Sequence, residues 1–335
     1  MQKFGIGQSV KRKEDNELLL GEGTFQDDLN LPGQAHAFFL RSPHAHADIE
    51  SIDNARASAM PGVVAIYSGA DVTADGLGTL PCVMDAFIPL TRPGGIPRYY
   101  PPNPLLPEAR VRHVGEAVAM VIAETPAQAR DAAEAIDVTY RDLPCVVETD
   151  RAEAPDAPTI WPEAPGNLSF FWEHGDKSAT DEAFDKAERV VSVDLINSRV
   201  IVNPIETRGA LGSYDEAGGR YTLHTNTQHP FETRAIVAEI LHCEESELRI
   251  LSPIIGGGFG MKHMVHIEQP MVAWAARKIG RPVRWMSERG EGFLSDTQAR
   301  DHVTHAELAL DGEANFTGLR VRTTANLGAY VSNLG

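Results

Sequence analysis

VGEAVAMVIAETPAQARDAAEAIDVTY, residues 114–140, is the stretch that says most about the fold of this chain. Residues 114–123 form an apolar run, which predicts a strand. Thr125 and Pro126 then predict the start of a helix, because threonine caps a first turn and proline fits the first helical position. Alanines recur on one face of that helix, and residues 138–140 return to an extended pattern. The sequence therefore predicts a strand–helix–strand unit.

Further strands and one long loop are predicted on the N-terminal side of this unit. Ala35–Arg41 is an apolar run, and residues 63–67 are rich in β-branched side chains after the Pro61-Gly62 turn. Residues 75–107, by contrast, are rich in glycine and proline and show weak periodicity. We interpret them as a long surface loop, a feature that is usually functional or docked on a partner when it occurs in a compact domain.

A proline-rich segment divides the chain. Residues 150–165 carry four prolines among acidic and small residues, the composition of an extended linker. Beyond it the periodicity predicts strands at 190–201, 221–226, 248–252, 283–287, 306–310 and 319–325, and helices at 180–187, 230–242 and 267–278. This mixture predicts an α+β protein with two domains, residues 1–150 and 166–335, joined by a linker over residues 151–165.

The chain is strongly acidic. Its 335 residues hold 30 Lys and Arg against 47 Asp and Glu, which gives a formal net charge of −17. Binding to nucleic acid depends on clustered basic side chains that neutralise phosphates. The one basic cluster, residues 11–13, is followed at once by Glu14 and Asp15. We therefore predict no nucleic-acid partner, and the length agrees with two domains.

The cysteines and the first residues indicate a cytoplasmic location. Cys82, Cys145 and Cys243 lie too far apart for the close thiolate spacing of zinc or iron–sulfur ligation, and an odd, sparse count suits a reducing compartment. Residues 1–15 are polar and lack the apolar centre of a secretion signal. No run approaches the ~20 apolar residues of a membrane helix. We expect a cytoplasmic protein without a membrane segment.

The strongest candidate for a binding site is GGGFGMK, residues 256–262. It follows an apolar strand and precedes a helix, where backbone amides can form an anion-binding concavity. Two nucleotide motifs fail on spacing: the dinucleotide fingerprint would need glycine at Met261 or His263, and a phosphate loop would need Ser or Thr at His263. Four glycines around one aromatic residue exceed the needs of a tight turn, so we interpret the loop as a place where a ligand approaches.

The sequence does not decide the roles of several other polar residues. Pro230 suits a first helical turn, which leaves Gln228 at the mouth of that helix with a free amide, although capping of the helix by Thr227 or Gln228 is the better interpretation on spacing alone. Glu206 and Arg208 are candidates either for a buried pair or for the lining of a site. Three short histidine pairs lack the glutamate or cysteines of a zinc motif and do not favour a metal site: His44 and His46, His263 and His266, His302 and His305.

Seven short motifs, taken together, resemble those of one family. They run in family order: GEGTF at 21–25, RSPHAHA at 41–47, VGEAVA at 114–119, ETRG at 206–209, TQHP at 227–230, GGGFGMK at 256–262 and ANLGAY at 325–330. The chain thus resembles the N-terminal part of the molybdenum-binding large subunit of the xanthine dehydrogenase, aldehyde oxidase and aerobic carbon monoxide dehydrogenase family. This resemblance spans essentially the whole chain. It implies an α/β-hammerhead domain followed by the first part of a molybdopterin-binding domain.

The resemblance also implies roles for individual residues. Gln228 corresponds to the amide that hydrogen-bonds the oxo ligand of molybdenum, and no side chain of this chain ligates the metal directly. Four residues correspond to the loop that packs against the cofactor beside the metal: Gly257, Gly258, Phe259 and Gly260. The glutamate that binds purines in the xanthine-oxidising branch is replaced by His263 or the neighbouring Met264, which argues against a purine substrate.

The activity implied by the resemblance is that of a molybdenum hydroxylase, an oxidoreductase that oxidises an aldehyde, an N-heterocycle or carbon monoxide with water as the oxygen source. The implied cofactor is molybdenum–molybdopterin in its cytosine dinucleotide form. The 2Fe-2S and FAD centres are expected on two partners, an iron-sulfur subunit and a FAD-binding subunit. Neither centre fits this chain, because it has no cysteine cluster and no nucleotide fingerprint.

The family's general base lies downstream of Gly335, so we expect the remaining C-terminal part of the large subunit as a further partner and predict that residues 1–335 alone are inactive. An alternative is a non-catalytic binding or assembly module, in which the hammerhead domain makes protein contacts and the glycine loop holds an anion. A nicotinamide dehydrogenase is disfavoured by the failed dinucleotide fingerprint.

Overall fold

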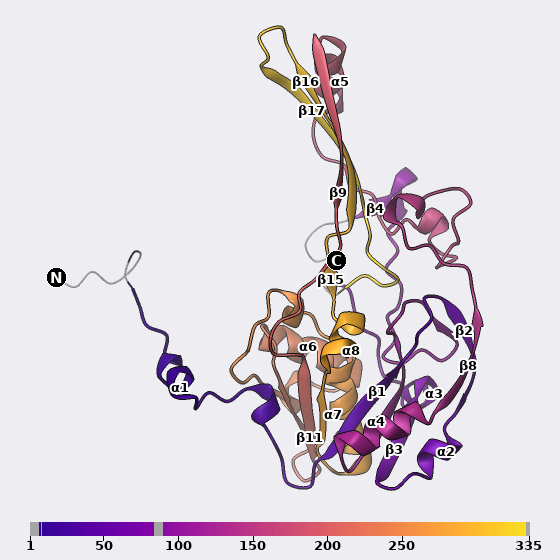
Figure 1. Ribbon diagram of the computed structural model, residues 1–335, viewed down its shortest axis with the longest axis vertical. Helices are drawn as coiled ribbons and strands as arrows, with labels where there is room; N and C mark the ends of the chain where they lie inside the picture. Colours follow the sequence, from indigo (N-terminus) through magenta and orange to yellow (C-terminus); the bar gives the residue numbers. More distant parts are fainter. Residues whose placement is uncertain (1–6, 8, 84–89, 333–335) are drawn as a thin grey trace, which may run out of the picture.

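The computed structural model describes residues 7, 9–83 and 90–332, so residues 84–89 of the predicted loop lie outside the description. The molecule consists of a body and an arm that projects from it (Figure 1). The body is built on a seven-stranded mixed sheet, and the arm is a three-stranded antiparallel sheet. Helices and strands are mixed along the chain, which confirms the predicted α+β class.

The seven-stranded sheet joins strands from both sides of the proline-rich segment. Its order is β13 (Leu248–Leu251), β12 (Arg220–Thr225), β11 (Gly209–Asp215), β14 (Val283–Met286), β1 (Ala35–Arg41), β7 (Ala117–Ala123) and β3 (Val63–Ser68). β1 pairs in parallel with β14 at Ala35 and Val283, and antiparallel with β7. One sheet therefore holds together parts of the chain that are far apart in the sequence.

The strand–helix–strand unit predicted from residues 114–140 is confirmed. The helix, α4 (Pro126–Glu134), starts as the sequence predicts, since the hydroxyl of Thr125 accepts a hydrogen bond from the Gln128 amide at 3.2 Å. Every residue of β7 is buried, because β1 and β3 flank it and α4 packs against it. This strand starts later than predicted, because Gly115 takes a left-handed conformation with φ of +91°.

The second strand of the unit belongs to another sheet. β8 (Asp137–Asp142) pairs with β2 (Ala47–Asp53), which also pairs with β6 (Arg110–Val111). Apolar side chains between this small sheet and β7 form a separate cluster around Ala47, Val111 and Val118. The α4 unit thus links the main sheet to this small sheet.

Two helices of the second half cover the other end of the main sheet. α6 (Pro230–Leu241) packs on β13, and α7 (Glu268–Ile279) packs on β11, β12 and β14; both agree with the predicted helices. α7 approaches β11 so closely that a Cβ on Gly212 would lie 2.6 Å from the carbonyl oxygen of Val272. Glycine at this position lets the helix lie directly on the sheet.

A single large core runs across the main sheet and includes side chains from both halves of the chain. Phe39, Met120, Met271 and Trp285 are fully buried in it. Leu105 and Leu106, from the segment predicted to be a surface loop, are buried there too. The interpretation of residues 75–107 as a surface loop is therefore wrong at its end, because a Leu-Leu pair between prolines supplies apolar surface that the core buries.

The arm consists of β9 (Arg189–Asn197), β16 (His302–Leu310) and β17 (Phe316–Ala325), with α5 (Lys177–Asp185) against β17. The predicted strand 190–201 is interrupted, and its end, β10 (Val200–Ile201), pairs with β15 (Gln298–Ala299) instead. All nine residues of β9 are exposed. The arm stands away from the body along its length (Figure 1).

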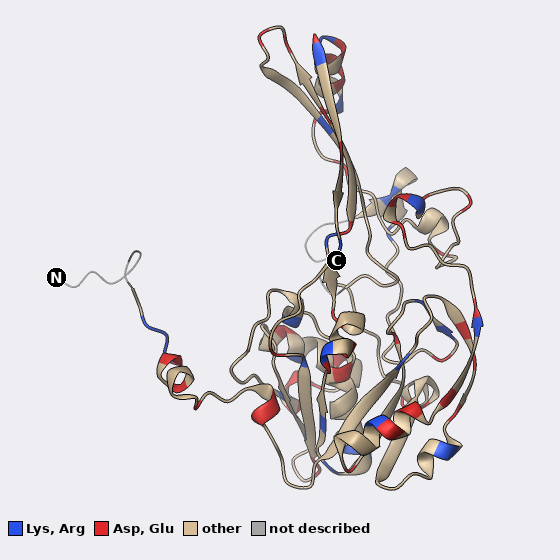
Figure 2. Cartoon of the chain, viewed as in Figure 1, with Lys and Arg blue, Asp and Glu red and all other residues tan. Residues whose placement is uncertain are grey.

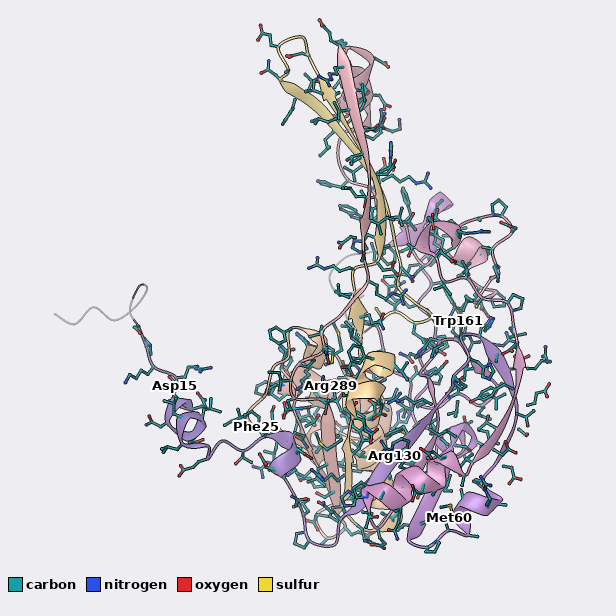
Figure 3. All side chains as sticks on the ribbon, viewed as in Figure 1. Asp15, Phe25, Met60, Arg130, Trp161 and Arg289 are labelled. Atoms are coloured by element: carbon teal, nitrogen blue, oxygen red, sulfur yellow. The ribbon has the colours of Figure 1, made fainter. Side chains whose placement is uncertain are left out.

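The proline-rich segment is packed against its surroundings. The Trp161 indole (Figure 3) donates a hydrogen bond to the carbonyl of Ala329 at 2.8 Å, and the guanidinium of Arg112 lies 3.6 Å from the centroid of its ring. Tyr330 contacts the same indole and donates a hydrogen bond to Glu116 at 2.6 Å. The division into residues 1–150, 151–165 and 166–335 stays a prediction.

Short elements complete the described chain. They are α1 (Asp15–Leu20), η1 (Gln26–Asp28), α2 (Ala55–Ser58), α3 (Gly69–Ala74), β4 (Thr91–Arg92), η3 (Pro93–Gly95), β5 (Ile96–Pro97), η4 (Thr149–Arg151), η5 (Pro165–Asn167), η6 (Glu245–Glu247), η7 (Met261–His263) and α8 (Arg289–Ser295). Lys and Arg are scattered among Asp and Glu over the body and the arm (Figure 2). Among the described residues, no helix has the length and apolar character needed to span a membrane.

Candidate cofactor-binding site

Gln228 and the glycine loop, which the sequence presents as two separate features, lie in contact. Gln228 lies between β12 and α6, and the loop follows β13. The side-chain oxygen of Gln228 accepts a hydrogen bond from the Gly260 amide at 3.0 Å. The backbone amide of Gln228 donates to the carbonyl of Lys262 at 3.0 Å. Two segments that are more than twenty residues apart therefore form one site.

Glycine at position 258 is required for this contact. A Cβ on Gly258 would lie 2.5 Å from the amide carbon of Gln228, a distance that real side chains do not tolerate. Gly257 and Gly260 have φ of +100° and +91°, which only glycine adopts without strain. Phe259 also has positive φ, and its side chain is 78% exposed. The loop thus presents backbone, with one aromatic ring turned outwards.

The backbone of the loop supplies unpaired donors. The Gly256 amide donates to a carboxylate oxygen of Glu206 at 2.9 Å, but the described residues provide no acceptor for the amides of Gly257, Gly258 and Phe259. Consecutive free amides in a loop with left-handed glycines form a concavity that attracts anions. The unpaired amides and the absence of side chains at Gly257, Gly258 and Gly260 therefore fit a cofactor that carries phosphate or other anionic oxygens.

Glu206 fixes the shape of the loop. The Glu206 carboxylate accepts a hydrogen bond from the Gly256 amide. It also accepts hydrogen bonds from the Lys262 ammonium at 2.8 Å and from the backbone amide of Gln26 at 3.1 Å. Burial lowers the pKa of Lys262, and the attraction of Glu206 opposes this shift. Arg289 (Figure 3), on α8, holds the segment before Glu206 through the carbonyl of Pro204 at 2.7 Å. The sequence left open a buried pair of Glu206 with Arg208, but in the structure Glu206 pairs with Lys262 instead.

Arg208 lies in a buried network of charges. Its guanidinium donates to Glu268 at 2.6 Å and to Asp296 at 2.6 Å, and Glu268 also accepts from Arg41 of β1 at 2.6 Å. Burial by itself would lower the pKa of Arg208, but the two carboxylates outweigh it and raise the pKa. The network connects β1, β11, α7 and α8 beneath the site. Arg208 is thus a buried structural residue.

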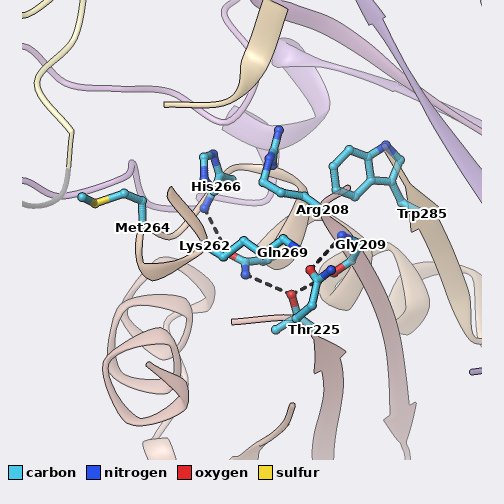
Figure 4. A pocket seen from close by; sticks show the side chains of 9 residues that line it. Arg208, Gly209, Thr225, Lys262, Met264, His266, Gln269 and Trp285 are labelled. Carbon is cyan, nitrogen blue, oxygen red and sulfur yellow. Dashed lines mark hydrogen bonds between the residues drawn. The ribbon is translucent and has the colours of Figure 1, made fainter. Parts of the chain in front are cut away.

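A small cavity lies behind the glycine loop (Figure 4). Its lining includes Lys262, His266 and Gln269, and the Gln269 amide donates to the Thr225 hydroxyl at 3.0 Å. Burial, together with the charge of Arg208, lowers the pKa of His266 to about 4, so this imidazole is neutral near pH 7. The cavity is lined by residues that support the loop from behind and is too small for a cofactor.

Sequence reasoning missed one cluster beside this site. The imidazole of His263 lies 2.8 Å from a carboxylate oxygen of Glu232, measured from Nε2, and stacks on the ring of His229 with centroids 4.8 Å apart. The sequence pairs His263 with His266, but the structure buries His266 and turns His263 towards α6. The spacing of His229 and Glu232, three residues apart at a helix start, is the only local signal of this cluster.

The comparison with known protein families identifies the chain. The family described as molybdopterin cofactor-binding domain matches residues 160–335, and the family described as aldehyde oxidase and xanthine dehydrogenase, a/b hammerhead domain, matches residues 20–144. The chain belongs to the xanthine dehydrogenase family of molybdenum-binding large subunits. A hammerhead domain followed by part of a molybdopterin-binding domain, as the motifs predict, is thereby confirmed.

Individual relatives support the same assignment. The chain is 34% identical to the nicotine 6-hydroxylase large subunit of Paenarthrobacter nicotinovorans, over 97% of this chain and 38% of that protein. It is also 34% identical to the carbon monoxide dehydrogenase large chain of Hydrogenophaga pseudoflava, over 95% of this chain and 39% of that protein. The chain therefore spans less than half the length of these relatives and matches their N-terminal part.

A solved structure gives the same result for the fold. Reconstituted carbon monoxide dehydrogenase from Oligotropha carboxidovorans superposes with a TM-score of 0.86 at 31% identity, over 95% of this chain and 39% of that one. Proteins with this arrangement bind a molybdopterin cofactor in the matched domain. The roles of Gln228 and of Gly257, Gly258, Phe259 and Gly260 stay predictions.

Proposed function

We propose that this chain forms the first part of the cofactor site of a molybdenum hydroxylase, an enzyme that oxidises an aldehyde, an N-heterocycle or carbon monoxide with oxygen from water. The observation that carries the proposal is the contact between Gln228 and the glycine loop. Because the Gly260 amide occupies the side-chain oxygen of Gln228, the NH₂ group of the same amide is left to donate. No acceptor for that group lies among the described residues.

This chain's residues would hold the cofactor and orient it. The free amides of Gly257, Gly258 and Phe259 would donate to its anionic oxygens, and Gln228 would donate to an oxygen beside the metal. Glu206 and Lys262 would keep the loop in the required shape. When bound, molybdenum–molybdopterin, proposed here in the cytosine dinucleotide form, would supply the two-electron redox chemistry.

Other groups complete the proposed enzyme. An iron-sulfur subunit with 2Fe-2S centres and a FAD-binding subunit would carry electrons away, since three widely spaced cysteines cannot ligate a cluster. The remaining C-terminal part of the large subunit would supply the general base and further walls of the pocket. Ile205, beside the loop, and Phe259, within it, are 95% and 78% exposed, which fits a site with a missing wall. We place the enzyme in the cytoplasm.

The substrate class also follows from the site. By the family resemblance, His263 or the neighbouring Met264 stands where the purine-oxidising branch carries a glutamate, and the imidazole of His263 is engaged with Glu232. A purine would lose the carboxylate that binds it there. We therefore propose a non-purine substrate.

The role of Gln228 can be tested in the intact complex. Gln228→Ala should lower kcat roughly ten- to a thousandfold, the effect of losing one preorganised donor to a developing charge. Molybdenum and pterin content should fall much less. Gln298→Ala, at an exposed position of β15, is the matched control and should leave kcat unchanged. Unchanged kcat in a molybdenum-replete Gln228→Ala enzyme would remove Gln228 from the mechanism.

Residues 1–335 alone should purify without stoichiometric molybdenum and should not reduce an artificial electron acceptor with aldehydes, N-heterocycles or carbon monoxide. Loss of a positioned general base typically lowers a rate by about 10²–10⁴-fold. Turnover by the isolated chain would contradict the proposal that the C-terminal part of the large subunit supplies the rest of the site. Absence of molybdenum and pterin from the whole complex would instead favour the binding or assembly module.

A further inference from the structure

We infer that His229, Glu232 and His263 form a binding site for a divalent transition-metal ion of the zinc class. Each side chain offers one ligand atom, and these atoms lie within 4.8 Å of one another. Two imidazoles and one carboxylate are a donor set that zinc uses in proteins, with a fourth position left for water or another ligand. This inference does not depend on the proposed function.

Two of the three distances between ligand atoms approach those of a tetrahedral site, and the remaining pair of ligand atoms lies within 4.8 Å. A carboxylate oxygen of Glu232 lies 2.8 Å from His263 Nε2 and 3.3 Å from His229 Nδ1. Metal–ligand bonds of about 2.0–2.2 Å place the ligand atoms of a tetrahedron about 3.3–3.6 Å apart. Small rotations of the side chains would therefore admit an ion between the three groups.

The backbone holds the three residues in place before any ion binds. His229 precedes the first turn of α6 and Glu232 lies within it, so the two side chains emerge on the same side. His263 ends η7, where its amide donates to the carbonyl of Gly260 at 3.1 Å. The hydrogen bond from the Gln228 amide to the Lys262 carbonyl ties the two segments together. Little conformational freedom would be lost on binding.

The surroundings leave the site open to a cation. The ammonium of Lys262 lies close by in sequence but is buried against Glu206, so it does not neutralise Glu232. The side chains of His229, Glu232 and His263 are 50%, 23% and 32% exposed, which gives an ion access from solvent. One competing contact exists: the Glu232 amide donates to His229 Nδ1 at 3.3 Å, a long hydrogen bond that an ion at this nitrogen would replace.

A mixed nitrogen and oxygen donor set also selects the kind of ion. Magnesium and calcium prefer shells made of oxygen atoms only, whereas imidazole favours zinc and its transition-metal neighbours. An ion bound here would connect the start of α6 to the segment that follows the glycine loop. It would bind the folded chain alone, because the unfolded chain does not bring position 263 near positions 229 and 232. The melting temperature should therefore rise with the zinc concentration.

The test uses the 335-residue chain, stripped of metal with a chelator and then titrated with Zn²⁺ in competition with a chromophoric indicator. We expect one ion per chain, and Co²⁺ should give the visible absorption of a tetrahedral site. His229→Ala and His263→Ala should each weaken Zn²⁺ binding by at least about a hundredfold, since even residues behind the ligands affect metal affinity ten- to a hundredfold. Glu232→Gln, which keeps the shape of the side chain, should also weaken it.

His305→Ala is the matched control, because His305 pairs with Asp194 at 2.7 Å on the arm and the described residues place no third ligand beside this pair. This variant should bind Zn²⁺ as the parent chain does. Circular dichroism of each variant checks the fold. Zn²⁺ affinity that is unchanged in a folded His229→Ala/His263→Ala double variant would overturn the inference, as would the absence of a one-to-one Zn²⁺ complex in the parent chain.

Discussion

The sheet of the body and the sheet of the arm both contain strands rich in apolar residues, but these strands lie in different surroundings. β7, AVAMVIA, has all seven residues buried, whereas β9, RVVSVDLIN, has all nine exposed. The inner strands of the body sheet have neighbours on both sides, and α4 and α7 pack on this sheet, whereas α5 packs on β17 of the arm and the short η4 contacts β16 and β17. A pattern of apolar residues therefore favours an extended strand, and tertiary packing determines whether the side chains of that strand are buried.

The uncovered face of the arm makes the contrast sharper. Val191, Val193 and Leu195 of β9 alternate onto one face, where pairing places them opposite Leu308, Ala306 and Thr304 of β16. Strand register thus lines up an apolar row that stays in contact with solvent in this chain. Substitutions of the same chemical type in the two sheets should have very different effects on stability.

The largest difference is expected for a buried charge. Val121→Asp in β7 would place a carboxylate at a position with 0% exposure and no partner, and we expect the chain to fail to fold. Val193→Asp in β9, at a position that is 47% exposed, should leave the fold intact. Circular dichroism and thermal melting of the two variants compare them directly. Similar melting temperatures would show that burial in β7 is not what stabilises the body.

The next largest effect concerns ion pairs. Glu268→Gln removes the buried negative charge that pairs with the guanidiniums of Arg208 and Arg41. This loss should lower the free energy of unfolding by about 3–5 kcal/mol. On the arm, Asp181→Asn removes one of the two carboxylates paired with Arg320, at an exposed position, and we expect no measurable change. Urea unfolding at neutral pH measures both. Equal effects would mean that the buried network does not hold the body together.

A pH effect of intermediate size is expected from His266. Its folded pKa, near 4, lies below the ordinary value of 6.5, so between these pH values the unfolded chain binds a proton that the folded chain does not. Stability should therefore fall as the pH drops from 6.5 towards 4, by about 2–3 kcal/mol from this group. His266→Gln should make the free energy of unfolding depend less steeply on pH in this range. If the free energy of unfolding of His266→Gln depends on pH as steeply as that of the parent chain, His266 is not the group that causes this pH dependence.

The smallest difference is expected for the loss of one methylene group. Ile122→Val in β7 should lower the free energy of unfolding by about 0.5–1.5 kcal/mol, because the fully buried side chain leaves a void. Ile196→Val in β9, where the side chain is 78% exposed, should have an effect within error. Urea unfolding again gives the comparison. A loss at position 196 as large as that at position 122 would indicate that the arm is covered in solution.

Much of the local structure could be predicted because its signals are local. The starts of α4 and α6 depend on a proline in the first turn and a capping side chain just before it; Thr125 caps α4 as predicted, whereas α6 is capped by His229 and not by Gln228. β11 was not predicted, since Gly209 and Gly212 interrupt its apolar pattern. Those glycines serve contacts with Met286 and α7, and no short-range signal in the sequence reports such contacts.

The candidate site shows the same division between sequence and tertiary structure. By itself, the sequence determined the glycine-rich loop and the family. Glycines at fixed spacing and seven ordered motifs can be recognised without knowing how far apart any atoms lie in the folded chain. Only the tertiary structure decided that Gly258 must be bare for Gln228 to reach Gly260, that Glu206 holds the loop and that Arg208 lies buried beneath it. It also brought His263 to His229 and Glu232, and β1 to β14. These are contacts between distant segments, and packing of the whole chain, rather than neighbouring residues, sets their geometry.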